Sequence, residues 1–262
     1  LVQGRLEKLR AVAPSSANEY RGNYSANGQS IAYFSDKESS DYRLWIEKDN
    51  RQQLVDLEVK AVSHMLSWSP DNNELIMLKS GQHRLFSYHL GTKELSYLTG
   101  EHEKIRRGIW SRNKALIYYV LDNELDYNIF SKSLNTQEVR QLTESGANYL
   151  QESADGKFLY YSVFEQPGLW RINVNSGEQE LLLADFSEQN YEFWQCSEQG
   201  VFYTRLANKK AGLFYTDFAS ANTQTLLADV EVKYFHVRND RLLISQVQQR
   251  EGDIFLTELV SQ

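Results

Sequence analysis

The sequence has 262 residues, 41% of them hydrophobic, and a formal net charge of −7. Its length and apolar content suffice for a sizeable core, while the acidic balance argues against a nucleic-acid-binding surface, which needs a basic face to pair with phosphates. A single cysteine, Cys196, excludes an internal disulfide and a cysteine-based zinc site, and suits the cytoplasm and the periplasm equally.

A polar turn followed by a β-rich run recurs six times along the chain. The turn serine is Ser25, Ser69, Ser111, Ser153 or Ser197, with Arg238 in the equivalent place, at spacings of 41 to 44 residues. The runs that follow are residues 31–34, 75–78, 116–119, 158–161, 201–204 and 242–245. Asp155-Gly156 is the clearest turn, because glycine takes the positive φ that such a turn requires.

An aliphatic–aromatic pair provides a second, independent marker of the repeat. The pairs are Leu44-Trp45, Leu85-Phe86, Ile129-Phe130, Leu169-Trp170, Leu213-Phe214 and Ile254-Phe255. Further short strands are expected at residues 95–99, 139–143 and 180–183, and one strand precedes each turn serine. Four short strands at a period near 40 predict an all-β fold, a six-bladed β-propeller of four-stranded antiparallel blades.

We expect one propeller domain over residues 1–262, closed by its N-terminal strand. The blades are predicted at about 20–57, 62–100, 105–144, 147–185, 190–229 and 233–260 plus 5–12. After Phe255 only seven residues remain, too few for another turn and strand. Residues 6–12 look like a fourth strand, so we predict that this strand completes the sixth blade and leaves no open sheet edge.

The absence of known catalytic and metal-binding motifs predicts no enzyme, no cofactor and no metal site. The sequence has no G-x-S-x-G, G-x-G-x-x-G, P-loop or H-E-x-x-H motif, and its histidines lack zinc-ligand spacing. Asp122, Glu124, Asp126 and Asn128 resemble the start of a calcium loop, but Tyr127 stands where that loop needs glycine. The simpler interpretation is that Asp126, like Asp41 and Asp253, sets the turn before a third strand.

The start of each first strand is the better candidate for a binding surface. Five residues before each turn marker stand Tyr20, His64, Arg106, Asn148, Glu192 and Lys233, which we predict ring a channel mouth. Two residues before it, Asn23, Ser67, Gln151, Gln195 and His236 are predicted to line the channel. Three residues before it stand the expected packing positions Gly22, Leu66, Gly108, Leu150, Trp194 and Phe235. The alternative is that loop-adjacent residues are polar simply because loops are wet.

The charge of the predicted mouth is mixed, which suits a protein, a peptide or a small polar ligand better than a polyanion. His64, Arg106 and Lys233 are opposed by Glu192. The nearby basic cluster of Lys104, Arg106 and Arg107 is interpreted as a solvated loop or a partner contact rather than a phosphate site, given the acidic background.

Several turns and strands resemble those of TolB-type (WD40-like) propeller repeats. Trp68-Ser69-Pro70-Asp71 and Ser153-Ala154-Asp155-Gly156-Lys157 resemble that family's W-S-P-D-G-K pattern, and Leu169-Trp170 and Leu142-Thr143 fit its third and fourth strands. The resemblance implies a six-bladed propeller that acts as a protein-interaction or sensory module, commonly in the bacterial envelope. The motif specifies blades and not an activity.

The degenerate repeats and the start at Leu1 rather than Met look more like the periplasmic C-terminal domain of CadC-type, membrane-anchored, winged-helix transcriptional regulators. This resemblance implies a non-enzymatic signal-input domain in the periplasm of a membrane-anchored protein, with no nucleic acid bound by this part. No apolar run approaches the roughly 20 residues of a membrane span. The alternatives are a TolB-like envelope interaction protein and the substrate-gating propeller of a prolyl-oligopeptidase-like hydrolase whose catalytic domain lies elsewhere. A glycan-active or lactonase-type propeller enzyme would need a carboxylate cluster or a metal at the channel.

Overall fold

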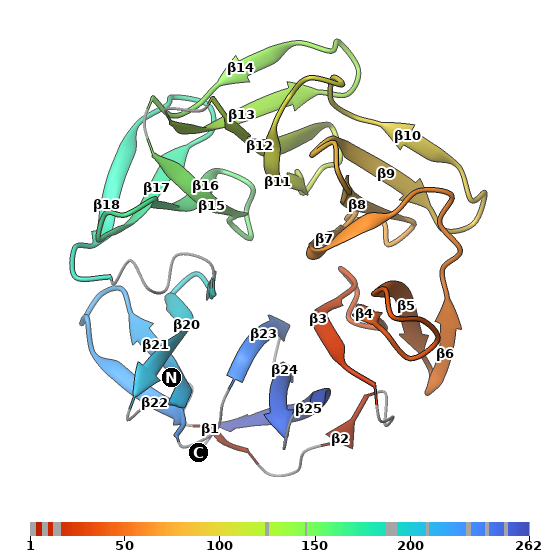
Figure 1. Ribbon diagram of the computed structural model, residues 1–262. Coiled ribbons are helices and arrows are strands. Elements are labelled where there is room, and N and C mark those ends of the chain that lie inside the picture. Colours follow the sequence, from red (N-terminus) through yellow and green to blue (C-terminus); the bar gives the residue numbers. More distant parts are fainter. Residues whose placement is uncertain are drawn as a thin grey trace. The chain divides into compact units, whose positions relative to one another are not determined.

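The computed structural model describes residues 4–6, 10–12, 17–123, 126–144, 146–186, 193–207, 210–228, 232–238, 241–248 and 251–261. Within these residues the regular structure is entirely β, without a helix, and the strands form small antiparallel sheets (Figure 1). The sheets are arranged as a β-propeller, which confirms the predicted fold class.

Five sheets are built from four strands that follow one another in the chain. The first contains β3 (Glu19–Tyr24), β4 (Ser30–Ser35), β5 (Arg43–Lys48) and β6 (Arg51–Leu54). The second contains β7 (Ala61–Trp68), β8 (Glu74–Lys79), β9 (Leu85–His89) and β10 (Leu95–Tyr97). The third contains β11 (Ile105–Trp110), β12 (Leu116–Asp122), β13 (Tyr127–Ser133) and β14 (Val139–Gln141).

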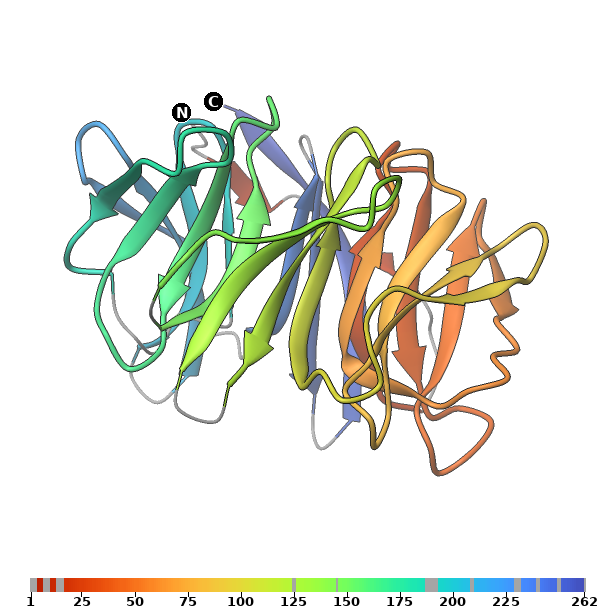
Figure 2. The same cartoon turned by 90° about the horizontal axis from the view of Figure 1, so that it is seen from above.

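The fourth sheet contains β15 (Ala147–Glu152), β16 (Phe158–Val163), β17 (Leu169–Asn173) and β18 (Gln179–Leu183). The fifth contains β19 (Trp194–Cys196), β20 (Gly200–Ala207), β21 (Lys210–Asp217) and β22 (Thr223–Leu227). Each predicted β-rich run lies in the second strand of its sheet, and each aliphatic–aromatic pair lies in the third. Figure 2 shows these sheets as twisted ribbons, as the handedness of the backbone requires.

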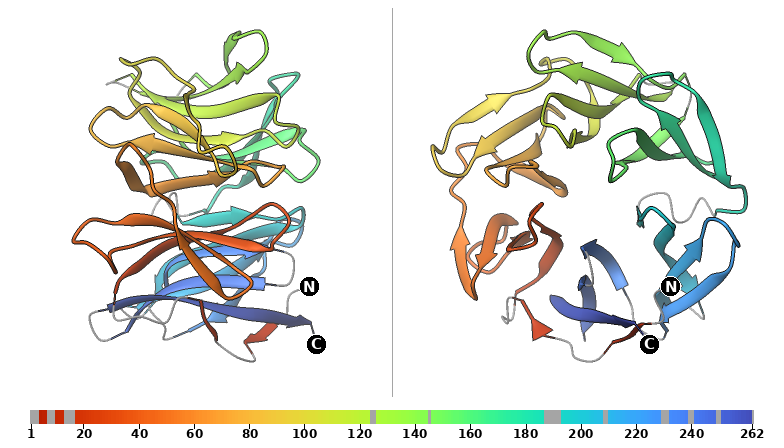
Figure 3. Two further views of the ribbon diagram at one scale, coloured as in Figure 1. Left: turned by 90° about the vertical axis from the view of Figure 1, so that its right-hand side faces the viewer. Right: turned by 180° about the vertical axis from the view of Figure 1, so that it is seen from behind.

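The sixth sheet joins the two ends of the chain. It contains β23 (Val232–Arg238), β24 (Arg241–Gln248) and β25 (Glu251–Ser261), with β1 (Gly4–Leu6) and β2 (Arg10–Ala11) both paired antiparallel to β25. Figure 3 shows the two short N-terminal strands beside dark blue β25. The predicted completion of the last blade is confirmed, although the strand expected over 6–12 is in fact two short strands. The 11-residue β25 is long enough to pair with both.

The turns that begin at Ser25, Ser69, Ser111 and Ser153 share one hydrogen-bond pattern. In the fourth, Ser153 Oγ donates to Asp155 Oδ1 at 2.7 Å and accepts the N–H of Phe158 at 3.0 Å. Asp155 Oδ1 also accepts the N–H of Lys157 at 3.1 Å. The fourth residue of the turn has a positive φ in all four, at Gly28, Asn72, Lys114 and Gly156. The turn is therefore specified by a serine and an Asp or Asn two residues later, and glycine is helpful but not required.

Tertiary contacts divide the chain into two compact units. Unit 1 comprises Leu1–Glu58, Phe202–Thr216 and Thr223–Gln262, and unit 2 comprises Val59–Val201 and Asp217–Asn222. The first and sixth sheets lie in unit 1. The second, third and fourth sheets lie in unit 2.

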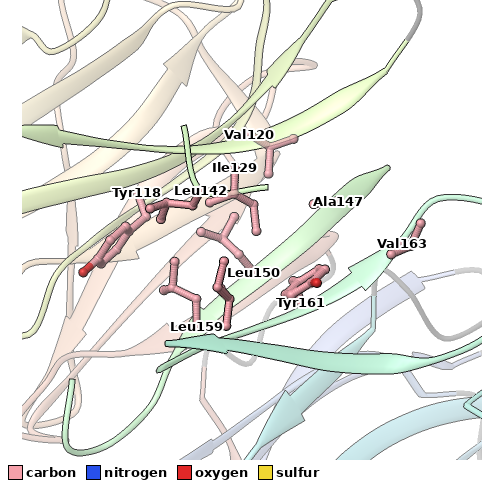
Figure 4. Packing of buried hydrophobic residues seen from close by; sticks show 10 residues of the cluster. Tyr118, Val120, Ile129, Leu142, Ala147, Leu150, Leu159, Tyr161 and Val163 are labelled. Atoms are coloured by element: carbon pink, nitrogen blue, oxygen red, sulfur yellow. The ribbon is translucent and has the colours of Figure 1, made fainter. Parts of the chain in front are cut away.

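The core of unit 2 fills the space between successive sheets. Figure 4 shows residues of the third sheet, including Tyr118, Val120 and Ile129, packed against Leu150 and Leu159 of the fourth. Each large apolar side chain that is buried in this way contributes about 1.5–3 kcal/mol. The predicted packing position Gly108 lies at the contact between the second and third sheets. Glycine is required there because a Cβ would come within 2.5 Å of Leu85 Cδ1.

Candidate binding site at the bulged first strands

The first strand of five sheets carries an irregularity near its start. Register shifts occur between Tyr20 and Asn23, Ala61 and Leu66, Ile105 and Arg107, Ala147 and Tyr149, and Val232 and Tyr234. The predicted mouth residues Arg106, Asn148 and Lys233 are the residues skipped by the pairing, and Tyr20 borders its shift. A β-bulge leaves a residue unpaired and redirects its side chain, and bulges are common beside functional sites. The side chain of His64 and all of Glu192 lie outside the described part of the structure.

In unit 2, the guanidinium of Arg106 lies over an aromatic ring. Its central carbon is 4.4 Å from the centroid of Tyr127, the first residue of β13. Tyr127 in turn makes an edge-to-face contact with Phe164, which directly follows β16, with centroids 5.3 Å apart. Among the described residues, Arg106 has no hydrogen-bond or ion-pair partner. The stack therefore holds the guanidinium in place, and none of its N–H donors is used by a described residue.

The next residue, Arg107, forms a second arginine–tyrosine stack. The guanidinium carbon of Arg107 is 4.5 Å from the ring centroid of Tyr149, which lies 4.7 Å from the ring of Trp194. Trp194 is buried and donates its indole N–H to Ser162 Oγ at 3.2 Å. Aromatic side chains of β15 and β19 thus support a cationic edge on β11, and each such contact is worth about 0.5–2 kcal/mol.

Asn148, the bulge residue of β15, is only 1% exposed. Its Nδ2 has no hydrogen-bond partner among the described residues. A buried donor without a partner costs about 1–3 kcal/mol, so its retention calls for a role or a bound water.

In unit 1, the corresponding region gathers tyrosines around Arg21. The Arg21 guanidinium lies 5.4 Å from the ring of Tyr20 and 4.8 Å from that of Tyr234, and Arg21 itself has a φ of 55°. Tyr20 also approaches Tyr42, with centroids 6.1 Å apart. Lys233 is exposed. A non-glycine residue at positive φ in a strand is strained, and such strain is common at functional sites.

Two of the residues predicted to line a channel, Gln151 and Asn23, form hydrogen bonds between neighbouring first strands. Gln151 Nε2 donates to the carbonyl of Cys196 at 2.9 Å, and Gln151 Oε1 accepts the N–H of Cys196 at 2.8 Å. Asn23 Oδ1 accepts the hydroxyl proton of Tyr234 at 3.5 Å. Ser67 and Gln195 are half-buried. The interaction of Gln151 is structural, and the sequence position alone did not reveal it.

His236 is also predicted to line the channel and lies against Tyr24, with ring centroids 5.9 Å apart. Burial lowers the pKa of His236 to about 4, and the positive charge of Arg238 adds to this shift. The ring is therefore neutral at physiological pH. Its Nδ1 has no hydrogen-bond partner within the described ranges.

Glu152, at the opposite end of β15 from the bulge, is a buried ionisable residue that sequence reasoning missed. It is 7% exposed at the end of β15 and accepts the backbone N–H of Arg112, in the turn of the third sheet, at 2.5 Å. Burial raises the pKa of Glu152 to about 7, although the N–H of Arg112 and the hydroxyl of Tyr118 oppose that shift. A signal was present, because the other repeats place Tyr24, Trp68, Trp110, Cys196 and Val237 immediately before the turn marker.

Asp126 has the turn-setting role that the sequence suggested. Its Oδ1 accepts the N–H of the following residue, Tyr127, at 2.8 Å and that of Gly146 at 2.5 Å. Over the described ranges, no group of three or more His, Cys, Asp or Glu side chains could hold a metal ion. The same ranges contain no helix long and apolar enough to cross a membrane.

Comparisons with known proteins show the fold. No protein-family model matches the chain, and no curated protein sequence matches it. Among solved structures, TolB from Acinetobacter baumannii is 13% identical with a TM-score of 0.62, over 94% of this chain and 65% of the other. A putative TolB from Agrobacterium tumefaciens is 13% identical with a TM-score of 0.65, over 96% and 94%. An oligogalacturonate lyase in complex with manganese is 9% identical with a TM-score of 0.65, over 100% and 99%. At these identities the likeness establishes a TolB-like propeller fold and leaves the function open.

Proposed function

We propose that the chain is a non-enzymatic interaction domain that binds a protein or peptide partner at the bulged starts of its first strands. The observation that carries this proposal is the recurrence of the irregularity in five first strands, with a different side chain at each. Within each unit, an interruption of strand pairing that carries a different side chain in each sheet provides a surface whose chemistry can change without loss of the fold.

The composition of this surface supports a protein partner. In unit 2 it combines arginines with tyrosines and a tryptophan, through the Arg106–Tyr127 and Arg107–Tyr149 stacks and the Tyr149–Trp194 contact. Arginine, tyrosine and tryptophan are the residue types that dominate binding energy at protein interfaces.

More specifically, we propose that the chain is the periplasmic signal-input domain of a membrane-anchored transcriptional regulator. The resemblance to TolB-type repeats and the likeness to two TolB structures support an envelope location. The regulator assignment rests on the resemblance of the repeats alone.

A second candidate function is favoured by one observation, the likeness of the whole chain to an oligogalacturonate lyase solved with manganese. A lyase of this kind would cleave an acidic sugar chain, and manganese binding would accompany its activity. Isothermal titration with Mn²⁺ and an assay for unsaturated products from oligogalacturonate distinguish this candidate from an interaction domain, which would give neither signal.

Site-specific photo-cross-linking tests the interaction proposal. We would place a benzoylphenylalanine at position 106 in unit 2 and at position 233 in unit 1, and express the protein in its native host. Position 157 provides the control, because Lys157 is exposed in the turn at the other end of its blade. We expect a discrete cross-linked partner from 106 or 233 and none from 157. Equal cross-linking from all three positions, or none from any, would contradict the proposal.

A further inference from the structure

We infer that Arg106 is a carboxylate-recognition site, and that the partner contributes an acidic segment to it. This inference rests on the proposed function and names the chemistry of the partner. The carboxylate would come from an Asp or Glu side chain or from a chain terminus.

Arg106 is prepared for such a ligand before it binds. Its guanidinium is held 4.4 Å over the ring of Tyr127, and Tyr127 is fixed by Phe164. Because a stacked guanidinium is planar and keeps its N–H groups at the edge, it presents a rigid fork that matches the two oxygens of a carboxylate. Little side-chain entropy remains to be lost on binding.

In two other stacked arginines of unit 2, Arg84 and Arg171, the guanidinium has a hydrogen-bond or ion-pair partner. Arg84 lies 3.9 Å from the ring centroid of Tyr97, donates to the carbonyl of Thr99 at 2.7 Å and approaches Glu101 at 3.7 Å. Arg171 lies 4.5 Å from the ring centroid of Phe158 and binds Glu180 at 2.6 Å. Arg106 has the same stack without a partner among the described residues. An incoming carboxylate would complete the arrangement that Glu180 completes for Arg171.

The charges around Arg106 favour a monoanion over a phosphate. Lys104 and Arg107 are close to Arg106 in the sequence. Their positive charges favour an acidic segment at this place, although the protein as a whole has a net charge of −7. Two carboxylates lie at the same end of the third sheet, Asp122 at the end of β12 and Asp126 just before β13. Asp126 is occupied by two backbone N–H groups, but its negative charge remains and opposes a dianion more strongly than a single carboxylate.

Nuclear magnetic resonance of the arginine Nε–H groups tests this inference on the intact chain. The Arg106 signal is assigned by its loss in Arg106→Lys, and the Arg171 signal by its loss in Arg171→Lys. The probes are sodium acetate, a Gly-Ser-Glu-Ser-Gly peptide capped at both ends, the same capped peptide with Gln, the Gln peptide with a free C-terminus, and inorganic phosphate.

We expect the capped Glu peptide to shift the Arg106 signal saturably and the capped Gln peptide to leave it unmoved. A response to the free C-terminus would identify a terminal carboxylate as a second source. In Arg106→Gln, followed through the Nε–H of Arg107, the affinity for the Glu peptide should fall about tenfold or more, because a charge-assisted pair is lost. Arg171→Gln is the matched control and should bind the Glu peptide as the parent does, since Arg171 already has Glu180.

Three outcomes would overturn the inference: an Arg106 signal that no carboxylate moves, equal shifts of Arg106 and Arg171, or a response to phosphate alone. Melting curves of each variant exclude unfolding as the cause. Failure here is separable from failure of the proposed function. Cross-links from position 106 without a carboxylate response would leave the interaction domain standing, whereas a carboxylate response without cross-links would leave only the anion site.

Discussion

Glu152 differs from the equivalent residues of the other repeats, and this difference gives it a raised pKa. The equivalent residues Tyr24, Trp110, Cys196 and Val237 are buried, and none of them carries a carboxylate. Glu152 occupies the same buried place and keeps a hydrogen bond from the N–H of Arg112. Because burial disfavours the charged form, its pKa rises to about 7.

This shift predicts that stability declines as pH rises. Between the ordinary glutamate pKa of about 4.5 and the folded value of about 7, the folded chain binds more protons than the unfolded chain. The contribution of Glu152 to the free energy of unfolding is therefore complete below pH 4.5 and is lost as pH increases to 7. The loss is on the order of 1–3 kcal/mol. In Glu152→Gln, the neutral side chain keeps the acceptor, so chemical denaturation should give a higher stability than the parent at pH 8.

The difference between parent and Glu152→Gln across pH 4 to 8 isolates this residue from His236. The pKa of His236 is lowered to about 4, so its contribution has the opposite sign and is lost as pH falls below 6.5. Glu138→Gln, in an exposed turn, is the control and should leave the profile of the parent unchanged. A parallel pair of curves for parent and Glu152→Gln would refute the assignment.

Asn148 gives a second prediction at the scale of a residue. If its buried Nδ2 is without any partner, Asn148→Ala removes an unsatisfied donor and should change the free energy of unfolding by less than about 1 kcal/mol. Asn128 is the control, because it is also buried and its Oδ1 accepts the hydroxyl proton of Thr143 at 3.4 Å. Urea denaturation of both alanine variants checks this. A loss above 2 kcal/mol for Asn148→Ala would mean that a bound water or another group completes its hydrogen bonds.

At the scale of elements, the turn was predictable because its chemistry is local. A serine, an Asp or Asn two residues later and a residue at positive φ are all within one short stretch, and the four turns repeat it. The bulge was not predictable as a bulge. The sequence shows polar residues five positions before each serine, but the extra residue becomes visible only in the register of β11 with β12 or β15 with β16.

Removal of a turn serine should destabilise its blade measurably. Ser153→Ala deletes the acceptor of the Phe158 N–H and the donor to Asp155, so the free energy of unfolding should fall by about 1–2 kcal/mol. Ser96→Ala is the matched control, on exposed β10, and should cost less than 0.5 kcal/mol, as is typical of surface sites. Equal costs for the two variants, measured by urea denaturation, would show that the shared turn pattern contributes nothing.

At the scale of the whole molecule, the period of the sequence predicted the propeller and the pairing of its two ends. Both follow from counting, because every blade needs four strands and the last repeat supplies only three. The candidate site was harder to predict from the sequence. The positions of Arg106 and Asn148 were predicted, but the contacts of the side chains were not. Arg106 and Tyr127 lie on non-neighbouring strands of one sheet, and Gln151 and Cys196 come from different repeats, so the spacing of the markers does not specify either pair.

The pairing of the chain ends leads to the prediction with the largest expected effect. Deletion of residues 1–12 removes β1 and β2, exposes the edge of β25 and takes Val12, which is 3% exposed, out of the core with Tyr33 and Leu243. The melting temperature should fall by more than about 5 °C, since each kcal/mol is worth roughly 2–4 °C in a chain of this size. Val12→Ala separates the two causes, because it removes the core contact and leaves both strands paired. If the deletion lowers the melting temperature no more than Val12→Ala does, the two strands add nothing to stability. Recovery of the melting temperature when the peptide of residues 1–12 is added would show that the pairing of these strands with β25 stabilises the last blade.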